Sequence, residues 1–297
     1  MAENTGAYAP EVLHRLWQVE TEIYREFARV CDENGLAYFA AFGTALGAVR
    51  HQGFIPWDDD IDVAMPREDY EKLIARAPEL FAAPYEVLEP RLTAGYVMPF
   101  AKLTRADSTF VEATDTDRTY HSGIFIDIFP MDWIWPDAKR RLRVYEKTFL
   151  LARLCVLTEY GRPKLPKGMT GWKKTVLHAG TMAVHGLLRL TGQTTQRLYA
   201  RYLRAATQTP RAEARGRIAD LLLYRQEANY GLDDPIYPEK MLFPTREVPF
   251  GDITVRVPGQ TGKYLARTFG EDYMTLPPEE KRHCHMPAVL EFPEERP

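Results

Sequence analysis

A helical pattern opens the sequence. Between residues 11 and 34, apolar side chains recur at intervals of three and four positions, which places them along one face of an amphipathic helix. Gly35 follows and ends the pattern, as glycine often does just beyond a helix. We expect the apolar face to pack on the protein core, and we assign it no chemistry. Its members are Leu13, Leu16, Val19, Ile23, Phe27 and Val30.

Shorter segments after this helix predict a β-sheet. Runs of apolar and β-branched residues separated by turn residues are typical of strands, and some segments between them have helical spacing. The expected strands are residues 36–42, 60–65, 85–88, 97–104 and 123–130, and the expected helices are residues 45–50 and 67–77. Residues 107–120 are polar and rich in threonine, so we expect a loop there.

The second half of the chain has a different pattern. Residues 137–160 and 172–226 have strong helical spacing, and the segment 161–168 between them contains the glycines and prolines of a loop. Towards the end, residues 253–257 alternate like a strand and residues 262–269 predict a helix.

This change in pattern predicts an α/β (α+β) protein in two parts. With 297 residues, of which 45% are hydrophobic, the chain can bury a large core. We expect a small mixed sheet with its helices at residues 11–136. A mainly helical lobe with a short C-terminal β element is expected at residues 137–297.

One helical segment raises the question of a membrane. Residues 175–190 are fairly apolar, but the segment is too short and too polar for a transmembrane span. Lys173 and Lys174 beside Trp172 could let this helix rest on an anionic membrane surface. We favour the alternative, a helix buried against the rest of the protein, because an apolar face more often marks core.

Charge and cysteine content exclude some classes of protein. The net charge of −3 argues against a nucleic-acid-binding surface, which usually carries a basic stripe. Cys31, Cys155 and Cys284 are far apart and odd in number, so we expect reduced thiols in a cytosolic protein. The N-terminus has no basic start and no apolar run, and it therefore predicts no signal peptide.

The chemistry begins with two aspartates that share one face of an expected strand. Asp60 and Asp62 are two positions apart, whereas Ile61 and Val63 point to the opposite face and into the core. Two carboxylates so placed repel each other unless a cation lies between them. A hard divalent ion such as Mg²⁺ is the expected cation, and a solvated acidic turn after Pro56 is the alternative.

Two further features favour the metal. Gly43 permits a tight turn after a strand, and Thr44 is a good N-cap for the following helix, so this turn predicts a phosphate site built from backbone N–H groups. Asp127 lies in an otherwise apolar strand, where a buried carboxylate needs a cationic partner. Three carboxylates beside a phosphate site suit metal-assisted phosphoryl transfer, although a salt bridge would also satisfy Asp127.

These residues resemble a known family. A Gly-Thr turn, then Asp60-Ile61-Asp62 and later Asp127, is similar to the nucleotidyltransferase-fold pattern. More narrowly, residues 43–70, 123–132 and 276–282 resemble the LicD family, which also includes fukutin-type domains. Members of this family transfer a substituted phosphate from a cytidine diphosphate donor to a sugar hydroxyl. The bacterial example uses CDP-choline and the animal example CDP-ribitol.

The resemblance implies a mechanism and a setting. Asp60, Asp62 and Asp127 would be the catalytic residues and would hold one or two Mg²⁺, with Mn²⁺ as a substitute. The acceptor hydroxyl would attack the phosphorus distal to the cytidine and release CMP. We expect transfer of phosphocholine from CDP-choline to a sugar hydroxyl of a cell-surface glycan or of a teichoic acid precursor. The acceptor would be a glycan or a lipid-linked glycan. The expected location is the cytoplasm, or the inner face of the cytoplasmic membrane.

Several other residues are candidates for donor binding. A cation–π cage is the expected way to hold a quaternary ammonium, and Trp57, Tyr120, Trp133 and Trp135 are candidates for it, with packing between lobes as the alternative. Lys102 could neutralise a donor phosphate, although most strand lysines serve solubility. The complete expected donor-binding set is Gly43, Thr44, Arg50, His51, Trp57, Lys102, Trp133, Trp135, Lys281 and Arg282.

Other functions stay open at this stage. The donor could carry ribitol, glycerol, ethanolamine or an aminoalkylphosphonate, or the enzyme could transfer a nucleotidyl group and release pyrophosphate. A degenerate member that only binds nucleotide or metal is the non-enzymatic alternative. An EF-hand loop starting at Asp58 fails, because Val63 and Asp69 stand where Gly and Glu are required. The sequence His283-Cys284-His285 makes a poor zinc site, because adjacent residues cannot all reach one tetrahedral ion.

Overall fold

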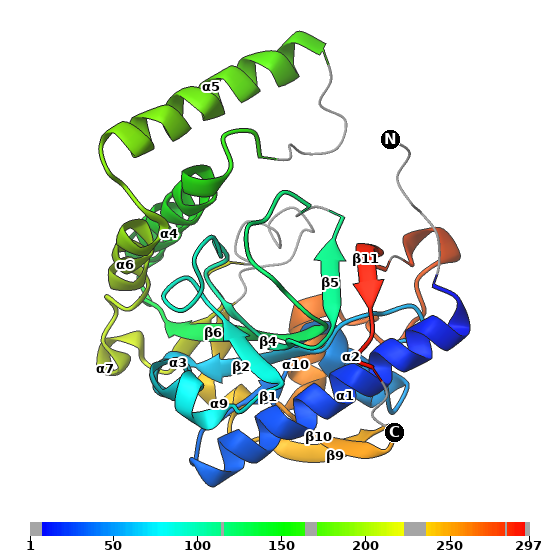
Figure 1. The fold of residues 1–297 in the computed structure, drawn as a ribbon. Coiled ribbons are helices and arrows are strands. Elements are labelled where there is room, and N and C mark those ends of the chain that lie inside the picture. Colours follow the sequence, from blue (N-terminus) through cyan, green and yellow to red (C-terminus); the bar gives the residue numbers. More distant parts are fainter. Residues whose placement is uncertain (1–7, 114–115, 164–170, 223–235, 283, 295–297) are drawn as a thin grey trace.

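A central sheet organises the computed structural model, which describes residues 8–113, 116–163, 171–222, 236–282 and 284–294 (Figure 1). Within these residues the sheet contains β1 (Phe39–Ala40), β2 (Asp62–Pro66), β3 (Tyr85–Leu88), β4 (Ala101–Arg105), β6 (Phe125–Trp133), β7 (Arg217–Ala219) and β8 (Ile236–Pro238). Two smaller sheets pair β9 (Arg246–Phe250) with β10 (Ile253–Val257) and β5 (Thr109–Glu112) with β11 (Pro287–Glu291).

The central sheet is mixed, and β6 lies at its middle. The first half of β6 is flanked by β2, which runs parallel to it, and by β4, which runs antiparallel. β1 pairs with the outer edge of β2, and β3 pairs with the outer edge of β4. The second half of β6 pairs with β7, which in turn pairs with β8. This architecture confirms the predicted α/β (α+β) class with a mixed sheet.

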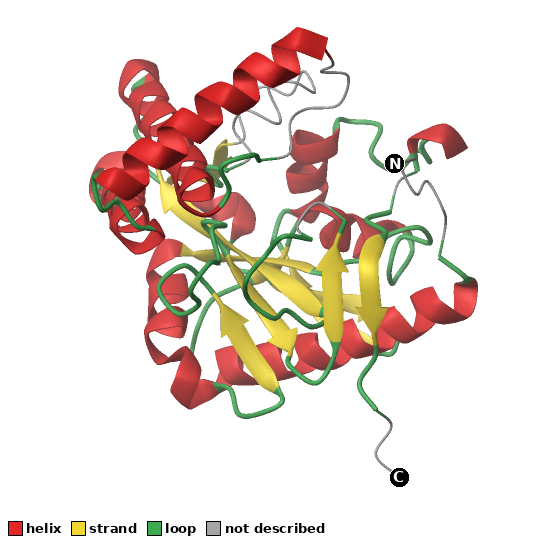
Figure 2. Cartoon of the chain, turned by 45° about the horizontal axis from the view of Figure 1, so that its top comes forward, coloured by secondary structure: helices red, strands yellow, loops and turns green. Residues whose placement is uncertain are grey.

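Helices cover the sheet and form a second group beside it (Figures 1 and 2). α1 packs against β4 and β6, and it begins with Pro10 at a position where the missing N–H costs no helical bond. The described helices are α1 (Pro10–Glu33), α2 (Phe42–Arg50), α3 (Arg67–Leu80), α4 (Ala138–Glu159), α5 (Gly171–Leu190), α6 (Thr195–Ala206), α7 (Arg211–Ala214), α9 (Glu239–Leu242), α10 (Thr261–Phe269) and the short 3₁₀ helix η1 (Glu279–Lys281).

The C-terminal segment joins the core of the sheet. The ring of Phe39 on β1 lies 5.8 Å from the rings of Phe243 and Tyr264, in edge-to-face contact with both. The hydroxyl of Tyr264 on α10 also accepts the N–H of Phe42 at 3.1 Å. Val255 and Val257 on β10 are buried in the same core. Residues near the end of the chain therefore support the turn that begins α2.

A second hydrophobic core lies among the helices of the other group. α4 packs chiefly against α6, and the rings of Tyr199 and Tyr202 stack there with their centroids 5.7 Å apart. α5 lies on α4, but only Leu188 of this helix is buried. The expectation that this apolar helix is buried is therefore wrong, because most of its apolar side chains face away from the protein.

Local boundaries differ from the expected ones in several places. β1 is only two residues long, and α2 begins at Phe42, so Thr44 lies inside the helix instead of capping it. The expected loop at residues 107–120 contains the strand β5, and the expected helix at residues 172–226 is broken and contains the strand β7. Both missed strands pair with segments distant in sequence, which local pattern does not reveal.

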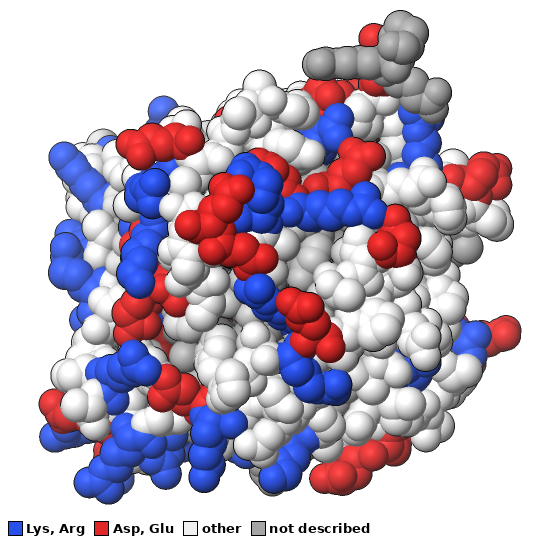
Figure 3. Space-filling model, turned by 90° about the horizontal axis from the view of Figure 1, so that it is seen from below, with Lys and Arg blue, Asp and Glu red and all other residues white. Residues whose placement is uncertain are grey.

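Charged side chains are interspersed on the molecular surface. Figure 3 shows Lys and Arg mixed with Asp and Glu on the face seen from below. Ion pairs link many of them, for example Arg25 with Asp252 and Arg256 with Asp32. This mixing agrees with the small net charge of −3. In the part of the chain that the structure describes, no helix combines the length and apolar character needed to cross a bilayer.

The packing around Gly123 gives a first prediction. A side chain here would overlap the backbone carbonyl oxygen of Arg105, and a backbone atom cannot move aside easily. We expect Gly123→Ala to lower the free energy of unfolding by about 2 kcal/mol or more, measured by urea denaturation. The matched control is Gly180→Ala on α5, where a methyl group meets no atom within 4 Å. An unchanged stability of Gly123→Ala would contradict the packing described.

Candidate active site

The parallel pairing of β2 with β6 places two of the predicted acids side by side. Asp62 on β2 is the register partner of Asp127 on β6. Neighbouring strands lie about 4.8 Å apart, so the two backbones are adjacent at this point. The N–H of Asp127 donates to the carbonyl of Ile61 at 2.9 Å, which fixes the register just where the acids meet. Asp60 immediately precedes this pairing, and Ile61 between the two acids is fully buried.

The turn that begins α2 supports this arrangement. The hydroxyl of Thr44 accepts the N–H of Asp62 at 2.8 Å, so it positions the start of β2. A Cβ at position 43 would lie only 2.8 Å from Oδ2 of Asp58, so Gly43 leaves room for that carboxylate. The structure therefore brings Gly43 and Thr44 next to the acids, in contacts that order the acidic strand.

The carboxylates at this junction lie in a crowded and poorly solvated place. Burial is the largest cause that raises the pKa of Asp60, and the neighbouring carboxylate of Asp58 adds to it. Burial and then Asp60 and Asp127 likewise raise the pKa of Asp62. Burial also raises the pKa of Asp127, although Lys102 opposes this effect. The pKa of Asp58 is raised to about 6 by burial and by Asp59.

Such a set of oxygen atoms suits a hard divalent cation, which prefers carboxylate ligands and would relieve the repulsion. Oδ1 of Asp127 is buried without a hydrogen bond of good geometry, although the Nζ of Lys102 lies 3.2 Å from it. Among the described residues, however, no three acidic, histidine or cysteine side chains as placed are close enough together to enclose a metal ion. The residue types and their crowding fit a cation, and the side chains would have to converge to bind it.

Lys102 is buried between two carboxylates. Its Nζ lies 3.2 Å from Oδ1 of Asp127 and 2.9 Å from Oε1 of Glu112 on β5. It also lies 3.2 Å from the centroid of the Phe125 ring, a cation–π contact. Although burial acts to lower it, the pKa of Lys102 is raised by these two carboxylates. Lys102, which was predicted to bind a donor phosphate, therefore keeps its positive charge at the site and forms an ion pair with Asp127.

Asp59 is a site residue that sequence reasoning missed. Its buried carboxylate accepts the hydroxyl of Tyr8 at 2.8 Å and the backbone N–H of His285 at 2.9 and 3.0 Å. Nδ1 of His285 lies 3.3 Å from Asp59 and 3.9 Å from Asp60. The contact with Asp59, against the effect of burial, raises the pKa of His285 to about 9. Asp59 thus ties both ends of the described chain to the acidic turn.

Glu20 is a second residue that the pattern concealed. It occupies an apolar-face position of α1, yet its carboxyl group is buried and its Oε2 has no hydrogen-bond partner. Burial, followed by the charges of Asp60 and Asp59, raises the pKa of Glu20 well above its usual value. A glutamate near the middle of a long amphipathic helix gave no signal of this kind.

A group of cationic and aromatic side chains includes Trp57, which directly precedes the acidic turn. The guanidinium of Arg282 lies over the Trp57 ring at 4.7 Å, and the His51 ring meets Trp57 edge-on at 6.2 Å. Nε of Arg50 donates to Nε2 of His51 at 3.0 Å. Burial and then the charge of Arg282 lower the pKa of Arg50. The structure therefore brings together four of the predicted donor-binding residues, which are Arg50, His51, Trp57 and Arg282. Lys281 precedes Arg282 at the end of η1, and its side chain is outside the described part of the chain.

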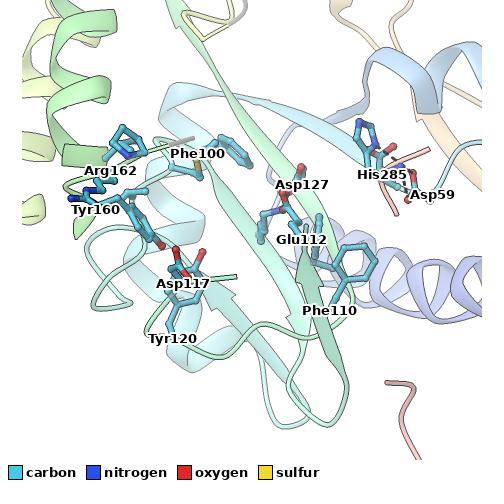
Figure 4. A pocket seen from close by; sticks show the side chains of 17 residues that line it. Asp59, Phe100, Phe110, Glu112, Asp117, Tyr120, Asp127, Tyr160, Arg162 and His285 are labelled. Atoms are coloured by element: carbon cyan, nitrogen blue, oxygen red, sulfur yellow. Dashed lines mark hydrogen bonds and ion pairs between the residues drawn. The ribbon is translucent and has the colours of Figure 1, made fainter. Parts of the chain in front are cut away.

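A cavity of about 360 Å³ extends from the acids towards the second helical group (Figure 4). In the figure, Asp59 and His285 lie at one end of this cavity and Asp127 with Glu112 in its middle. Tyr120, Asp117, Tyr160 and Arg162 lie towards the other end. Phe100 and Lys102 also line it. The cavity therefore joins an acidic end to an end with aromatic side chains.

Trp133 and Trp135 do not line this cavity. Nε1 of Trp133 donates to Glu68, and Arg211 lies 4.9 Å over its ring, so this side chain is buried elsewhere. Trp135 borders a separate hollow together with Arg140. Trp133 is six residues beyond Asp127 on the same strand, or roughly 20 Å at 3.3 Å per residue, and this separation removes both tryptophans from their expected place beside the acids.

Comparison with known proteins gives independent information. Residues 35–150 match the family model described as LicD/FKTN/FKRP, nucleotidyltransferase domain. The chain is 48% identical over 48 residues to the lipopolysaccharide cholinephosphotransferase LicD of Haemophilus influenzae, a match that covers 16% of this chain and 18% of that protein.

Two uncharacterized rickettsial proteins match a longer segment. Identity over 125 residues is 27% with the protein of Rickettsia typhi and 36% with that of Rickettsia prowazekii. These matches cover 42% of this chain in both cases, and 38% and 45% of the two relatives, so the chain spans less than half of each relative. The acidic turn, β2 and β6 all lie inside the family match. Residues 35–150 are therefore similar to the LicD-family nucleotidyltransferase domain.

Proposed function

We propose that the protein transfers a substituted phosphate, with phosphocholine as the first candidate, from a CDP-linked donor to a sugar hydroxyl of a cell-envelope glycan, and releases CMP. The observation that carries this proposal is the pairing of Asp62 with Asp127 across β2 and β6, within the LicD-family domain. The similarity to a named cholinephosphotransferase supports choline as the substituent.

The acids have a specific role in this proposal. Asp60, Asp62 and Asp127 would hold one or two Mg²⁺, and the metal would neutralise charge on the donor diphosphate. An oxygen of the acceptor hydroxyl forms a bond to the phosphorus distal to the cytidine, the bond from that phosphorus to the bridging oxygen breaks, and CMP leaves. A carboxylate of the cluster takes the hydroxyl proton.

The cationic groups hold the donor on either side of the acids. Contacts through His51 and Trp57 connect Arg50 with Arg282 next to the acidic turn, where a diphosphate or its leaving CMP would find positive charge. Trp57 offers a flat ring at the same place for a nucleobase. Lys102 keeps Asp127 in position through their 3.2 Å ion pair, and it is close enough to the acids to meet a phosphate oxygen.

The aromatic end of the cavity suits the substituent. Phe100, Tyr120 and Tyr160 line it, and the carboxylate of Asp117 lies among them (Figure 4). A quaternary ammonium is attracted to aromatic faces, and a nearby carboxylate strengthens the attraction. These residues replace Trp133 and Trp135 as the expected choline cage. Trp57, Tyr120, Trp133 and Trp135 were the residues predicted for a cage, and of these four only Tyr120 borders this cavity.

Transfer of phosphoribitol or phosphoglycerol is the second candidate for the same site. The acids and arginines would serve any CDP-linked donor equally, because they act on the diphosphate. Nucleotidyl transfer with release of pyrophosphate is the third candidate reaction. The products distinguish these reactions: CMP with a substituted phosphate on the acceptor in the first two, and pyrophosphate from a nucleoside triphosphate in the last.

Removal of one carboxylate tests the reaction. We expect Asp62→Asn and Asp127→Asn each to lower the rate of Mg²⁺-dependent CMP release from CDP-choline by about a thousandfold or more, because charge stabilisation at the phosphorus is lost. Donor binding, measured by calorimetry, should change much less. The control is Asp252→Asn, which changes an exposed aspartate paired with Arg25. Full turnover of the unaltered protein in excess EDTA would refute the scheme.

The aromatic end of the cavity gives a separate prediction. We expect Tyr160→Leu and Tyr120→Leu to raise KM for CDP-choline by about tenfold, since each removes a cation–π contact worth roughly 1 kcal/mol or more. KM for CDP-glycerol, which carries no cation, should stay the same. Trp135→Leu serves as the control, because this ring lies outside the cavity. If the two donors respond alike, the aromatic end does not recognise the ammonium group.

A further inference from the structure

α5 turns its apolar side chains outward. In Figure 1 this helix lies away from the sheet and rests on α4. Its most exposed large side chains are Trp172 (72% exposed), Val176 (60%), Leu187 (59%) and Leu190 (88%). A surface helix usually packs such residues against its own protein. Here they have no cover within the described part of the chain.

These side chains share one face of the helix. Steps of three and four residues return to the same side of an α-helix, and the exposed apolar residues follow such steps for the length of α5. We call them the outer stripe, and its members are Trp172, Val176, Ala179, Ala183, Leu187 and Leu190.

The opposite face of α5 is held to the protein by polar contacts. The hydroxyl of Thr181 donates to the carbonyl of Gly161 at 2.9 Å, and Nδ1 of His185 lies 2.8 Å from the carbonyl of Leu157. Leu188, on the same side, is buried. These contacts fix the rotation of the helix about its axis. The outer stripe therefore faces away from α4 because the polar face is anchored.

The charge of α5 adds a second, independent observation. The helix contains Lys173, Lys174 and Arg189 and no aspartate or glutamate, in a chain whose net charge is −3. Trp172 lies at one end of the stripe, and tryptophan favours the boundary between water and apolar material. A helix with an apolar stripe, basic residues and a terminal tryptophan is complementary to an anionic lipid surface.

We propose that α5 lies flat on an anionic lipid bilayer, with the outer stripe among the headgroups and the flanking Lys173 and Arg189 on the lipid phosphates. A second copy of the chain is a weaker occupant. Pairing two outer stripes would place the flanking Lys173 and Arg189 of both copies at the edges of one interface, and no acid on the helix would balance them. Lipid phosphates supply that balance.

This position would have a consequence for the cavity. Tyr160 and Arg162 line its far end and follow directly on α4, and Nε of Arg162 donates to Sδ of Met182 on α5 at 3.1 Å. A bilayer in contact with the outer stripe of α5 would place the cavity close to a lipid-linked acceptor. Only this consequence rests on the proposed function, since the docking itself follows from the helix alone.

Vesicle flotation of the full chain tests the docking. We expect the protein to float with vesicles of phosphatidylcholine and phosphatidylglycerol at 7:3, and much less with phosphatidylcholine alone. The triple variant Trp172→Ser, Leu187→Ser and Leu190→Ser should lower the partition coefficient by about tenfold or more. The matched control changes Met274 and Leu276 to Ser, which are 50% and 51% exposed on another segment, and should float as the unaltered chain does.

Several outcomes would overturn the proposal. It fails if the unaltered chain does not float with the anionic vesicles, or if the triple variant floats equally well. It also fails if the unaltered chain forms a dimer that the triple variant abolishes, without vesicle binding. CMP release in solution is measured on the same samples, and its absence together with intact flotation would reject the proposed reaction while leaving the docking in place.

Discussion

The structure depends on how it tolerates several carboxylates in one poorly solvated place. Asp62 pairs with Asp127 where β2 and β6 run in parallel, Asp58 and Asp60 lie just before β2, and burial raises the pKa of all four. An isolated buried carboxylate costs several kcal/mol, and like charges nearby add to that cost. Lys102 offsets part of the cost for Asp127. In the function proposed above, a bound divalent cation would offset the repulsion that remains.

The rest of the chain is arranged to hold these acids in place. The hydroxyl of Thr44 fixes the start of β2, and Gly43 leaves room for Asp58. Asp59 connects Tyr8 near the beginning of the described chain with His285 near its end. The acidic turn is therefore supported from segments more than 200 residues apart, which explains why the C-terminal elements share the core of the sheet.

Sequence pattern predicted what is local and missed what is distant. The periodicity of α1 was enough to place the main helix, since it reflects a single element packed on one core. The alternation from Asp60 to Val63 predicted a strand, which in the structure begins only at Asp62. Trp133 lies far from the acids, contrary to the prediction, because the extended strand β6 carries it six residues beyond Asp127. Asp59 and Glu20 were missed because their roles come from contacts across the fold, which no spacing in the sequence records.

Binding of Mn²⁺ is the most direct test of the central claim that the three aspartates exist to hold a divalent cation. Electron paramagnetic resonance of the free ion, titrated with protein in the presence of CMP, counts the sites and gives their affinity. The account predicts one or two sites in the unaltered chain, and their loss when Asp62 and Asp127 are both changed to Asn. Equal binding by the unaltered and doubly changed proteins, or none by either, would contradict it.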